Sequence, residues 1–173
     1  LAVHDDGSGP ALYVGGRFTA IGGVTAPNLA KWNGTAWSQV GPGAVGGNAQ
    51  ALASYDPGTG LRLFAGLPDG RIRRLDPAGW TTVASADGGI TMLRPLASRG
   101  TLVAGGPFGS IGGALALGAA EWNGSTWTQL GDGLVSDAVG TVTALRAVAG
   151  ANGPELYVGG QFLTIGGIVR NRI

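Results

Sequence analysis

Short apolar segments alternate along the chain with turns rich in Gly, Pro, Asp and Ser, and this alternation repeats. The segment LYVGG at Leu12 returns as LFAGL at Leu63, LVAGG at Leu102 and LYVGG at Leu156. An apolar segment and a turn precede each copy, and nine to eleven residues separate the leucines that open the two segments. Such regular spacing around turn residues predicts two strands joined by a tight turn in every unit.

A tryptophan heptapeptide predicts two more strands. The chain contains KWNGTAW and, ninety residues later, EWNGSTW. Because an Asn-Gly pair tolerates positive φ, each heptapeptide is expected to reverse the chain between two strands. This turn would place Trp32 opposite Trp37 on one face, and Trp122 opposite Trp127. Each complete unit therefore contains four predicted strands.

The second repeat shows which part of the unit is dispensable. Leu75 follows Leu63 by twelve residues, whereas Trp32 follows Leu12 by twenty, so eight residues are missing. The missing residues match the F-x-x-I-G-G segment, and LDPAGW still aligns with WNGTAW, so Trp80 is the closing aromatic residue of this unit. We therefore predict that F-x-x-I-G-G is a loop insertion between the second and third strands.

The repeat length indicates a β-propeller. The leucines that open successive units lie 51, 41 and 52 residues apart, and no segment keeps the apolar spacing of a helix. Four short antiparallel strands per unit of this length are the signature of a propeller blade. We interpret 1–173 as one repeat array with blades at about 1–50, 51–91 and 92–143 and a partial blade at 144–173, about three and a half blades in all. A β-solenoid is the alternative.

The motifs resemble a known family. The string LYVGG-x-F-x-x-I-G-G followed by W-N-G-x-x-W resembles the Kelch repeat, and it is similar to tandem repeats of large secreted bacterial proteins. The aromatic pair stands closer together here than in Kelch proteins. The resemblance covers essentially the whole chain, and it implies propeller geometry, a bacterial source and an extracellular or cell-surface location.

Three and a half blades do not close a ring, because propellers ordinarily have about four to eight. Such an array would expose a sheet face and an unfinished strand pair, both of which favour association. We therefore expect either that the chain continues in a longer repeat protein or that copies complete one another. Two chains would then make a ring of about seven blades.

The amino-acid composition narrows the classes of partner that the chain is expected to bind. A net charge of +1 with 12% charged residues predicts neither nucleic-acid binding nor attraction to an anionic membrane. No apolar run approaches the roughly 20 residues of a membrane span, so no membrane insertion is expected. The absence of cysteine excludes disulfides and thiolate metal sites.

Candidate catalytic groups are few. The single histidine, His4, stands beside Asp5 and Asp6 in HDDGSG, a combination that would suit acid–base or metal chemistry. The matching turn of the second repeat, YDPGTG, keeps Asp56 without a histidine, which favours a structural turn. Most of the ten acids also lie in turns, and the sequence does not bring them together as glycoside hydrolysis requires. No catalytic residue, metal or cofactor is predicted.

Candidate binding residues lie in the insertion loops. Aromatic residues that recur once per blade are expected to pack between blades, although exposed tryptophans would also suit sugar stacking. The residues assigned to this structural role are Trp32, Trp37, Trp80, Trp122 and Trp127. The least repetitive loop positions and their neighbouring anchors are the predicted contacts for a partner: Arg17, Phe18, Gln161 and Phe162.

Two functions fit the sequence. The first is a noncatalytic scaffold or adhesion module that binds a protein or glycan through loops on one propeller face, or assembles with copies of itself. The alternative is a propeller-type polysaccharide lyase or glycoside hydrolase, whose acids would converge at the centre of the ring. A cluster of ionisable groups around that centre would favour the enzyme, and a centre lined by backbone and small apolar side chains would favour the scaffold.

Overall fold

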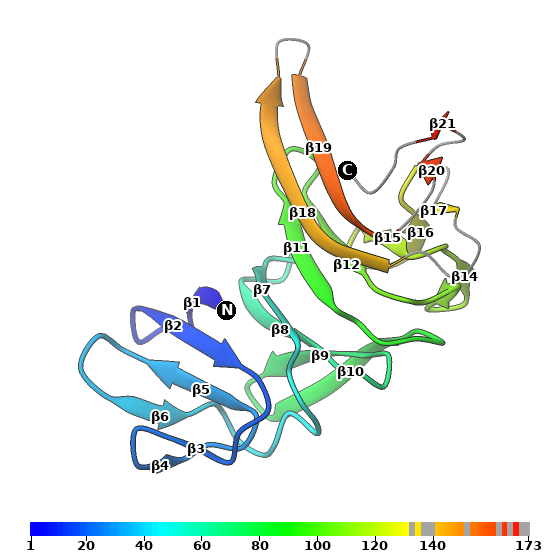
Figure 1. Ribbon diagram of the computed structural model, residues 1–173. Helices are drawn as coiled ribbons and strands as arrows, with labels where there is room; N and C mark the ends of the chain where they lie inside the picture. The colour runs from blue at the N-terminus through cyan, green and yellow to red at the C-terminus, as the bar shows by residue number, and fades with distance from the viewer. Residues whose placement is uncertain (132–133, 136–140, 151–152, 162–163, 166–167, 170–173) are drawn as a thin grey trace.

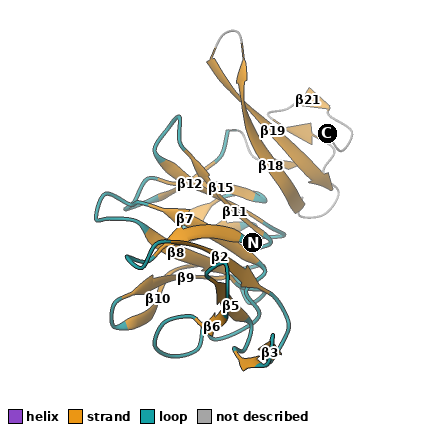
Figure 2. Ribbon diagram, turned by 90° about the vertical axis from the view of Figure 1, so that its left-hand side faces the viewer, coloured by secondary structure: helices purple, strands orange, loops and turns teal. Residues whose placement is uncertain are grey.

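The described part of the chain is entirely β-structure and turns. The computed structural model describes residues 1–131, 134–135, 141–150, 153–161, 164–165 and 168–169. Within these residues there is no helix, and three four-stranded antiparallel sheets follow one another along the chain (Figure 1; Figure 2). Among the described residues no helix is long and apolar enough to cross a membrane.

In each sheet the four strands lie side by side in the order in which they occur along the chain. The first sheet consists of β1 (Ala2–Asp5), β2 (Pro10–Gly15), β5 (Leu29–Trp32) and β6 (Trp37–Gln39). The second consists of β7 (Ala51–Tyr55), β8 (Arg62–Gly66), β9 (Arg71–Asp76) and β10 (Gly79–Ser85). The third consists of β11 (Met92–Leu96), β12 (Thr101–Gly105), β15 (Ala119–Trp122) and β16 (Trp127–Gln129).

Small hairpins occupy the insertions between second and third strands, as the second repeat predicted. These hairpins are β3–β4 (Ala20–Ile21, Val24–Thr25) and β13–β14 (Ser110–Ile111, Ala114–Leu115). The fourth unit begins with the paired strands β18 (Thr141–Gly150) and β19 (Gly153–Gln161). A three-stranded sheet joins β17 (Leu134–Val135), β20 (Thr164–Ile165) and β21 (Ile168–Val169).

The tryptophan hairpins have the predicted register. Trp32 pairs with Trp37, and their ring centroids are 5.2 Å apart. Trp122 pairs with Trp127, with stacked rings 5.9 Å apart. In the first of these turns Gly34 has a φ of 101°, which a residue with a side chain rarely adopts. The Asn-Gly turn therefore closes both hairpins as expected.

The core consists of layers between successive sheets. Because side chains alternate across a strand, Leu63 and Ala65 of β8 pack toward the first sheet and Phe64 packs toward the third. Leu102 of β12 likewise packs toward the second sheet, and Val103 packs toward β18. We call the face that meets the preceding sheet the back face and the face that meets the following sheet the forward face.

The first strands of successive units lie beside one another. β1 contacts β7, β7 contacts β11, and β11 contacts β18. All strand pairs of the described residues are antiparallel, which excludes a parallel β-solenoid. In Figure 1 the described sheets follow one another without closing into a ring.

Candidate functional site

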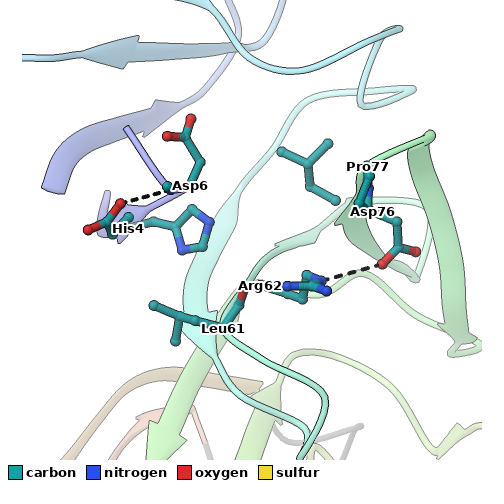
Figure 3. A pocket seen from close by; sticks show the side chains of 9 residues that line it. His4, Asp6, Leu61, Arg62, Asp76 and Pro77 are labelled. Atoms are coloured by element: carbon teal, nitrogen blue, oxygen red, sulfur yellow. Dashed lines mark hydrogen bonds and ion pairs between the residues drawn. The ribbon is translucent and has the colours of Figure 1, made fainter. Parts of the chain in front are cut away.

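A cleft of about 400 Å³ opens between the first and second sheets (Figure 3). The residues that line it are His4, Asp5, Asp6, Gly7, Leu61, Arg62, Leu75, Asp76 and Pro77. At the next interface the matching space is filled, because Trp122 packs against Tyr55 and Phe64 with ring centroids 5.9 and 5.6 Å away. Leu75 stands where that interface has Trp122, and His4 stands where it has Tyr55. These smaller side chains leave the cleft open.

His4 connects the two sheets. Its side chain is buried, and its Nδ1 lies 2.8 Å from the hydroxyl of Ser54 on β7. Burial lowers the pKa of His4, although the carboxylates of Asp6 and Asp5 act in the opposite direction. The imidazole is therefore neutral at physiological pH and serves as a hydrogen-bonding link between β1 and β7.

Asp6 is the centre of a polar network at the end of the first sheet. Its Oδ2 accepts hydrogen bonds from the Tyr13 hydroxyl at 2.9 Å and from Lys31 Nζ at 2.7 Å, and its Oδ1 accepts one from the Ser8 hydroxyl at 2.7 Å. Burial tends to raise the pKa of Asp6, but the bonds from Lys31, Ser8 and Tyr13 outweigh it and hold this pKa well below its usual range. Asp6 is thus an ionised acceptor whose oxygens are already bound.

Burial, followed by the hydrogen bond to Asp6, raises the pKa of Tyr13 above its usual value. The phenol therefore stays protonated and keeps donating to the carboxylate. Its ring is fully buried, so this pair attaches the turn after β1 to the interior of the interface between the two sheets.

Asp5 supports a turn. Its Oδ1 accepts hydrogen bonds from the backbone N–H groups of Gly7 and Gly9 at 2.9 and 3.0 Å. Asp56 makes the same two bonds in the second repeat, with distances of 2.8 and 2.9 Å to Gly58 and Gly60. Both aspartates therefore hold the turns that the sequence predicted at HDDGSG and YDPGTG.

Asp76 lies on the opposite side of the cleft. Arg74 donates to both of its oxygens at 2.8 and 3.0 Å, Thr81 donates at 2.6 Å, and Arg62 Nε lies 3.9 Å from Oδ1. The hydrogen bonds from Arg74 are the main cause of the lowered pKa of Asp76. Figure 3 shows Arg62 and Asp76 facing His4 and Asp6 across the space.

The three carboxylates of the cleft are therefore occupied by groups of the chain itself. A catalytic pair needs one carboxyl group held protonated and another directed at the substrate. In the described ranges no group of three or more His, Cys, Asp or Glu side chains is placed to hold a metal ion. The arrangement suits structural cohesion, because His4 is also bonded to Ser54 and Arg62 donates to the carbonyl of Leu61.

The predicted binding residues belong to two different repeats. Arg17 is exposed and Phe18 is half-buried in the turn after β2, whereas Gln161 is exposed at the end of β19. The second and third sheets lie between these positions along the chain. Phe162 lies outside the described residues.

The insertion hairpin of the third repeat has a role that sequence reasoning missed. Asp87, which follows β10, accepts hydrogen bonds from the N–H groups of Gly109 and Ser110 at 2.8 and 3.0 Å and from the Ser110 hydroxyl at 3.0 Å. A backbone bridge joins Ala86 to Ile111, whose side chain is fully buried. The hairpin is thus fastened to the preceding sheet.

The glycines around this attachment were the available sequence signal. A Cβ on Gly88 would overlap the backbone of Pro107, and one on Gly106 would overlap the backbone of Gly89. Close backbone approach of this kind requires glycine. The Asp-Gly-Gly run between two repeats therefore marks a contact between neighbouring sheets.

Comparison with known proteins gives no relative from which a function is transferred. No family model matches the chain, and neither the curated proteins nor the solved structures contain a significant match.

Proposed function

We propose that the chain is a segment of a Kelch-like β-propeller in which each four-stranded sheet is a blade. The strand order within the sheets and the contacts of β1, β7, β11 and β18 with one another support this proposal. In a propeller the first strands of the blades surround the axis, and the blades pack face to face. The layers of apolar side chains between successive sheets fit such packing.

We further propose a noncatalytic scaffold or adhesion function, at the cell surface or outside a bacterial cell. The main support is that the carboxylates of the cleft accept hydrogen bonds from the protein's own donors. A polysaccharide lyase or glycoside hydrolase would need acids directed at a substrate. Trp80, Trp122 and Trp127 pack in the layers between sheets, whereas Trp32 and Trp37 are half-buried on the first sheet. Loops between the strands remain as the surfaces that vary, and such loops carry binding in repeat proteins.

The partner is a protein or a glycan, and the first insertion loop is the proposed contact. Arg17 is exposed there beside the half-buried ring of Phe18. A cation and an adjacent aromatic ring suit an acidic or hydroxyl-rich partner. The same repeat design also permits assembly with further copies of the chain.

A polysaccharide turnover assay tests the noncatalytic part of this proposal. The chain is incubated with a panel of neutral and acidic polysaccharides, and reducing ends and unsaturated sugar products are measured. We expect no product above a heat-denatured control. Sustained release of either product by the folded chain would establish the lyase or hydrolase alternative.

A printed glycan array, read in parallel with an array of surface proteins, tests the binding loop. Arg17→Ala is expected to weaken capture of the bound probe by about tenfold, since one charge-assisted contact is lost. Arg94→Ala removes another exposed arginine, from β11, and is the matched control. Equal losses in the two variants would show that net charge, and not the loop, governs binding.

A further inference from the structure

The cleft between the first and second sheets is lined by two polar atoms that make no hydrogen bond within the described residues. His4 is only 5% exposed and its Nδ1 lies 2.8 Å from the Ser54 hydroxyl, whereas its Nε2 has no such partner. The Oδ1 of Asp5 accepts from Gly7 and Gly9, whereas its Oδ2 accepts from neither. Figure 3 shows the His4 ring directed at the open space. Both atoms are therefore available to a ligand.

Arg62 and three apolar side chains complete the lining. Arg62 donates to the carbonyls of Leu61 and Thr59 at 2.9 and 3.4 Å. A guanidinium has five N–H donors, so Arg62 can also donate to a ligand. The apolar lining consists of Leu61, which is 45% exposed, Leu75 and Pro77. One ligand would thus meet hydrogen-bonding groups and apolar surface together.

The charges of the cleft nearly cancel. The carboxylate of Asp6 is paired with Lys31 at 2.7 Å, and that of Asp76 is paired with Arg74 at 2.8 Å. One further acid, Asp5, and one arginine remain in the lining. Because binding requires electrostatic complementarity, this balance favours a neutral ligand over a strongly charged one.

The size and place of the cleft suit a binding site. Its volume of about 400 Å³ lies in the range of small-molecule sites, roughly 300–1,000 Å³. Both walls belong to the described sheets, and the first sheet contributes the face that meets the second. At the next interface Trp122 fills the matching space. The cleft is therefore a feature of one interface and not of the repeat.

We infer that the cleft binds one sugar unit of a neutral glycan through its hydroxyl groups. A hydroxyl both donates and accepts, so it suits the Nε2 of His4 in either tautomer. A neighbouring hydroxyl donates to Oδ2 of Asp5 and accepts from Arg62, while the C–H face of the ring covers the apolar lining. This inference rests on the glycan partner of the proposed function and gives it a second contact, apart from Arg17.

An NMR titration of the whole chain tests the inference. The probes are the methyl pyranosides of glucose, galactose, mannose and N-acetylglucosamine, each added up to about 100 mM because single sugars bind weakly. At least one is expected to shift the amide signals of Gly7, Leu61 and Asp76 in a saturable way. Cyclohexanol, a ring with a single hydroxyl, should bind about tenfold more weakly. No saturable shift with any sugar, or equal binding of cyclohexanol, would overturn the inference.

Asp5→Asn tests the carboxylate contact. The asparagine keeps an Oδ1 that accepts from Gly7 and Gly9 and replaces the available Oδ2 by a donor, so the affinity should fall about tenfold while the turn stays intact. Asp56→Asn makes the same change in the equivalent turn of the second repeat, outside the cleft, and should leave the affinity unchanged. Equal affinities in the two variants would contradict the assigned contact.

Leu75→Trp tests the place of binding, because the larger side chain is expected to fill the cleft as Trp122 fills the matching space. The folded variant should lose the saturable shifts with every sugar. Binding that survives both Leu75→Trp and Asp5→Asn would place the sugar elsewhere and overturn the inference. If Leu75→Trp does not fold, Asp5→Asn and its control decide the question.

The two proposals fail in different ways. A chain that binds no sugar in the cleft but still captures a probe through Arg17 would overturn only the cleft contact. A chain that binds a sugar in the cleft and releases sugar products would overturn only the noncatalytic function.

Discussion

At the residue scale, hydrogen bonds between polar side chains fix the turn that follows β1. Asp6 accepts from Tyr13, Lys31 and Ser8, and His4 reaches across to Ser54. Hydrogen bonds to a charged acceptor contribute more than bonds to a neutral one, and the Asp6 carboxylate accepts three of them from side chains. The ionisation of Asp6 therefore belongs to the stability of the interface between the first two sheets.

Acid titration tests this role of Asp6. Its pKa in the folded chain lies below the usual value of 3.8, so the stabilisation is present above pH 3.8 and is lost as the pH falls through the lower folded value. Asp6→Asn should therefore reduce the free energy of unfolding at neutral pH, and the difference from the wild type should shrink below about pH 4, as measured by urea unfolding.

Tyr55→Phe is the matched control for that titration. The Tyr55 hydroxyl donates to the carbonyl of Gly100 at 2.9 Å, a neutral acceptor. Its removal should cost about 1 kcal/mol, and this cost should not change across the acidic range. A constant difference for Asp6→Asn over the same range would contradict the account of Asp6.

At the scale of elements, the insertion hairpins connect neighbouring sheets. The β13–β14 hairpin is attached to the end of β10 through Asp87 and the Ala86–Ile111 bridge. In the fourth unit β20 pairs with β17, so this hairpin also meets a segment that follows the preceding sheet. The second repeat has no insertion. Val45 is instead buried in the layer between the first and second sheets. Arg73 donates a hydrogen bond to the Val45 carbonyl at 2.8 Å.

Hydrogen exchange tests the attachment by Asp87. Asp87→Ala removes the acceptor of the Gly109 and Ser110 N–H groups, so both amides should exchange faster, while the amides within β12 and β15 keep their protection. These backbone bonds lower the pKa of Asp87, so the wild-type protection should fade at acidic pH as that carboxylate gains a proton. Asp69→Ala removes an exposed ion pair with Arg71 and should leave both amides unchanged. Unaltered exchange in Asp87→Ala would show that the bridge alone holds the hairpin.

Local patterns explain why the elements could be predicted from the sequence. The Asn-Gly turns specify the hairpins, and the repeated leucines specify the register of the strands. The eight-residue gap marks the insertion. Each of these signals reflects contacts between residues that are close in the sequence. The attachment of Asp87 to Ser110 joins residues 23 positions apart in different repeats, and the cleft depends on Leu75 facing His4 across two sheets. The Asp87 attachment and the cleft both depend on how neighbouring sheets are placed relative to each other. The spacing of residues within one repeat does not encode this placement.

At the scale of the whole molecule, the back faces of the second and third sheets each meet the forward face of the preceding sheet. The same positions recur at each interface with different side chains, and the size of those side chains decides whether a layer is filled. Trp122 fills the layer between the second and third sheets, whereas Leu75 leaves the cleft in the layer before it. Packing between sheets thus stabilises the array, and the smaller side chains at one interface leave the cleft between the first and second sheets open.

A reciprocal pair of substitutions tests this equivalence. Leu75→Trp should fill the cleft and raise the free energy of unfolding by about 1 kcal/mol, because more apolar surface is buried. Trp122→Leu should lower it by about 2–4 kcal/mol and open a new cavity beside Phe64. Urea unfolding measures both, and destabilisation by Leu75→Trp would show that the two interfaces are not equivalent.

The nuclear Overhauser effect between aromatic rings tests the central claim most directly, namely that successive repeats stack back face on forward face. The ring of Trp122 lies 5.6 Å from that of Phe64 and 5.9 Å from that of Tyr55, both in the preceding sheet. The stacking therefore predicts cross-peaks from the Trp122 indole to both rings. Cross-peaks from Trp122 that reach only its own sheet, in a folded chain, would contradict it.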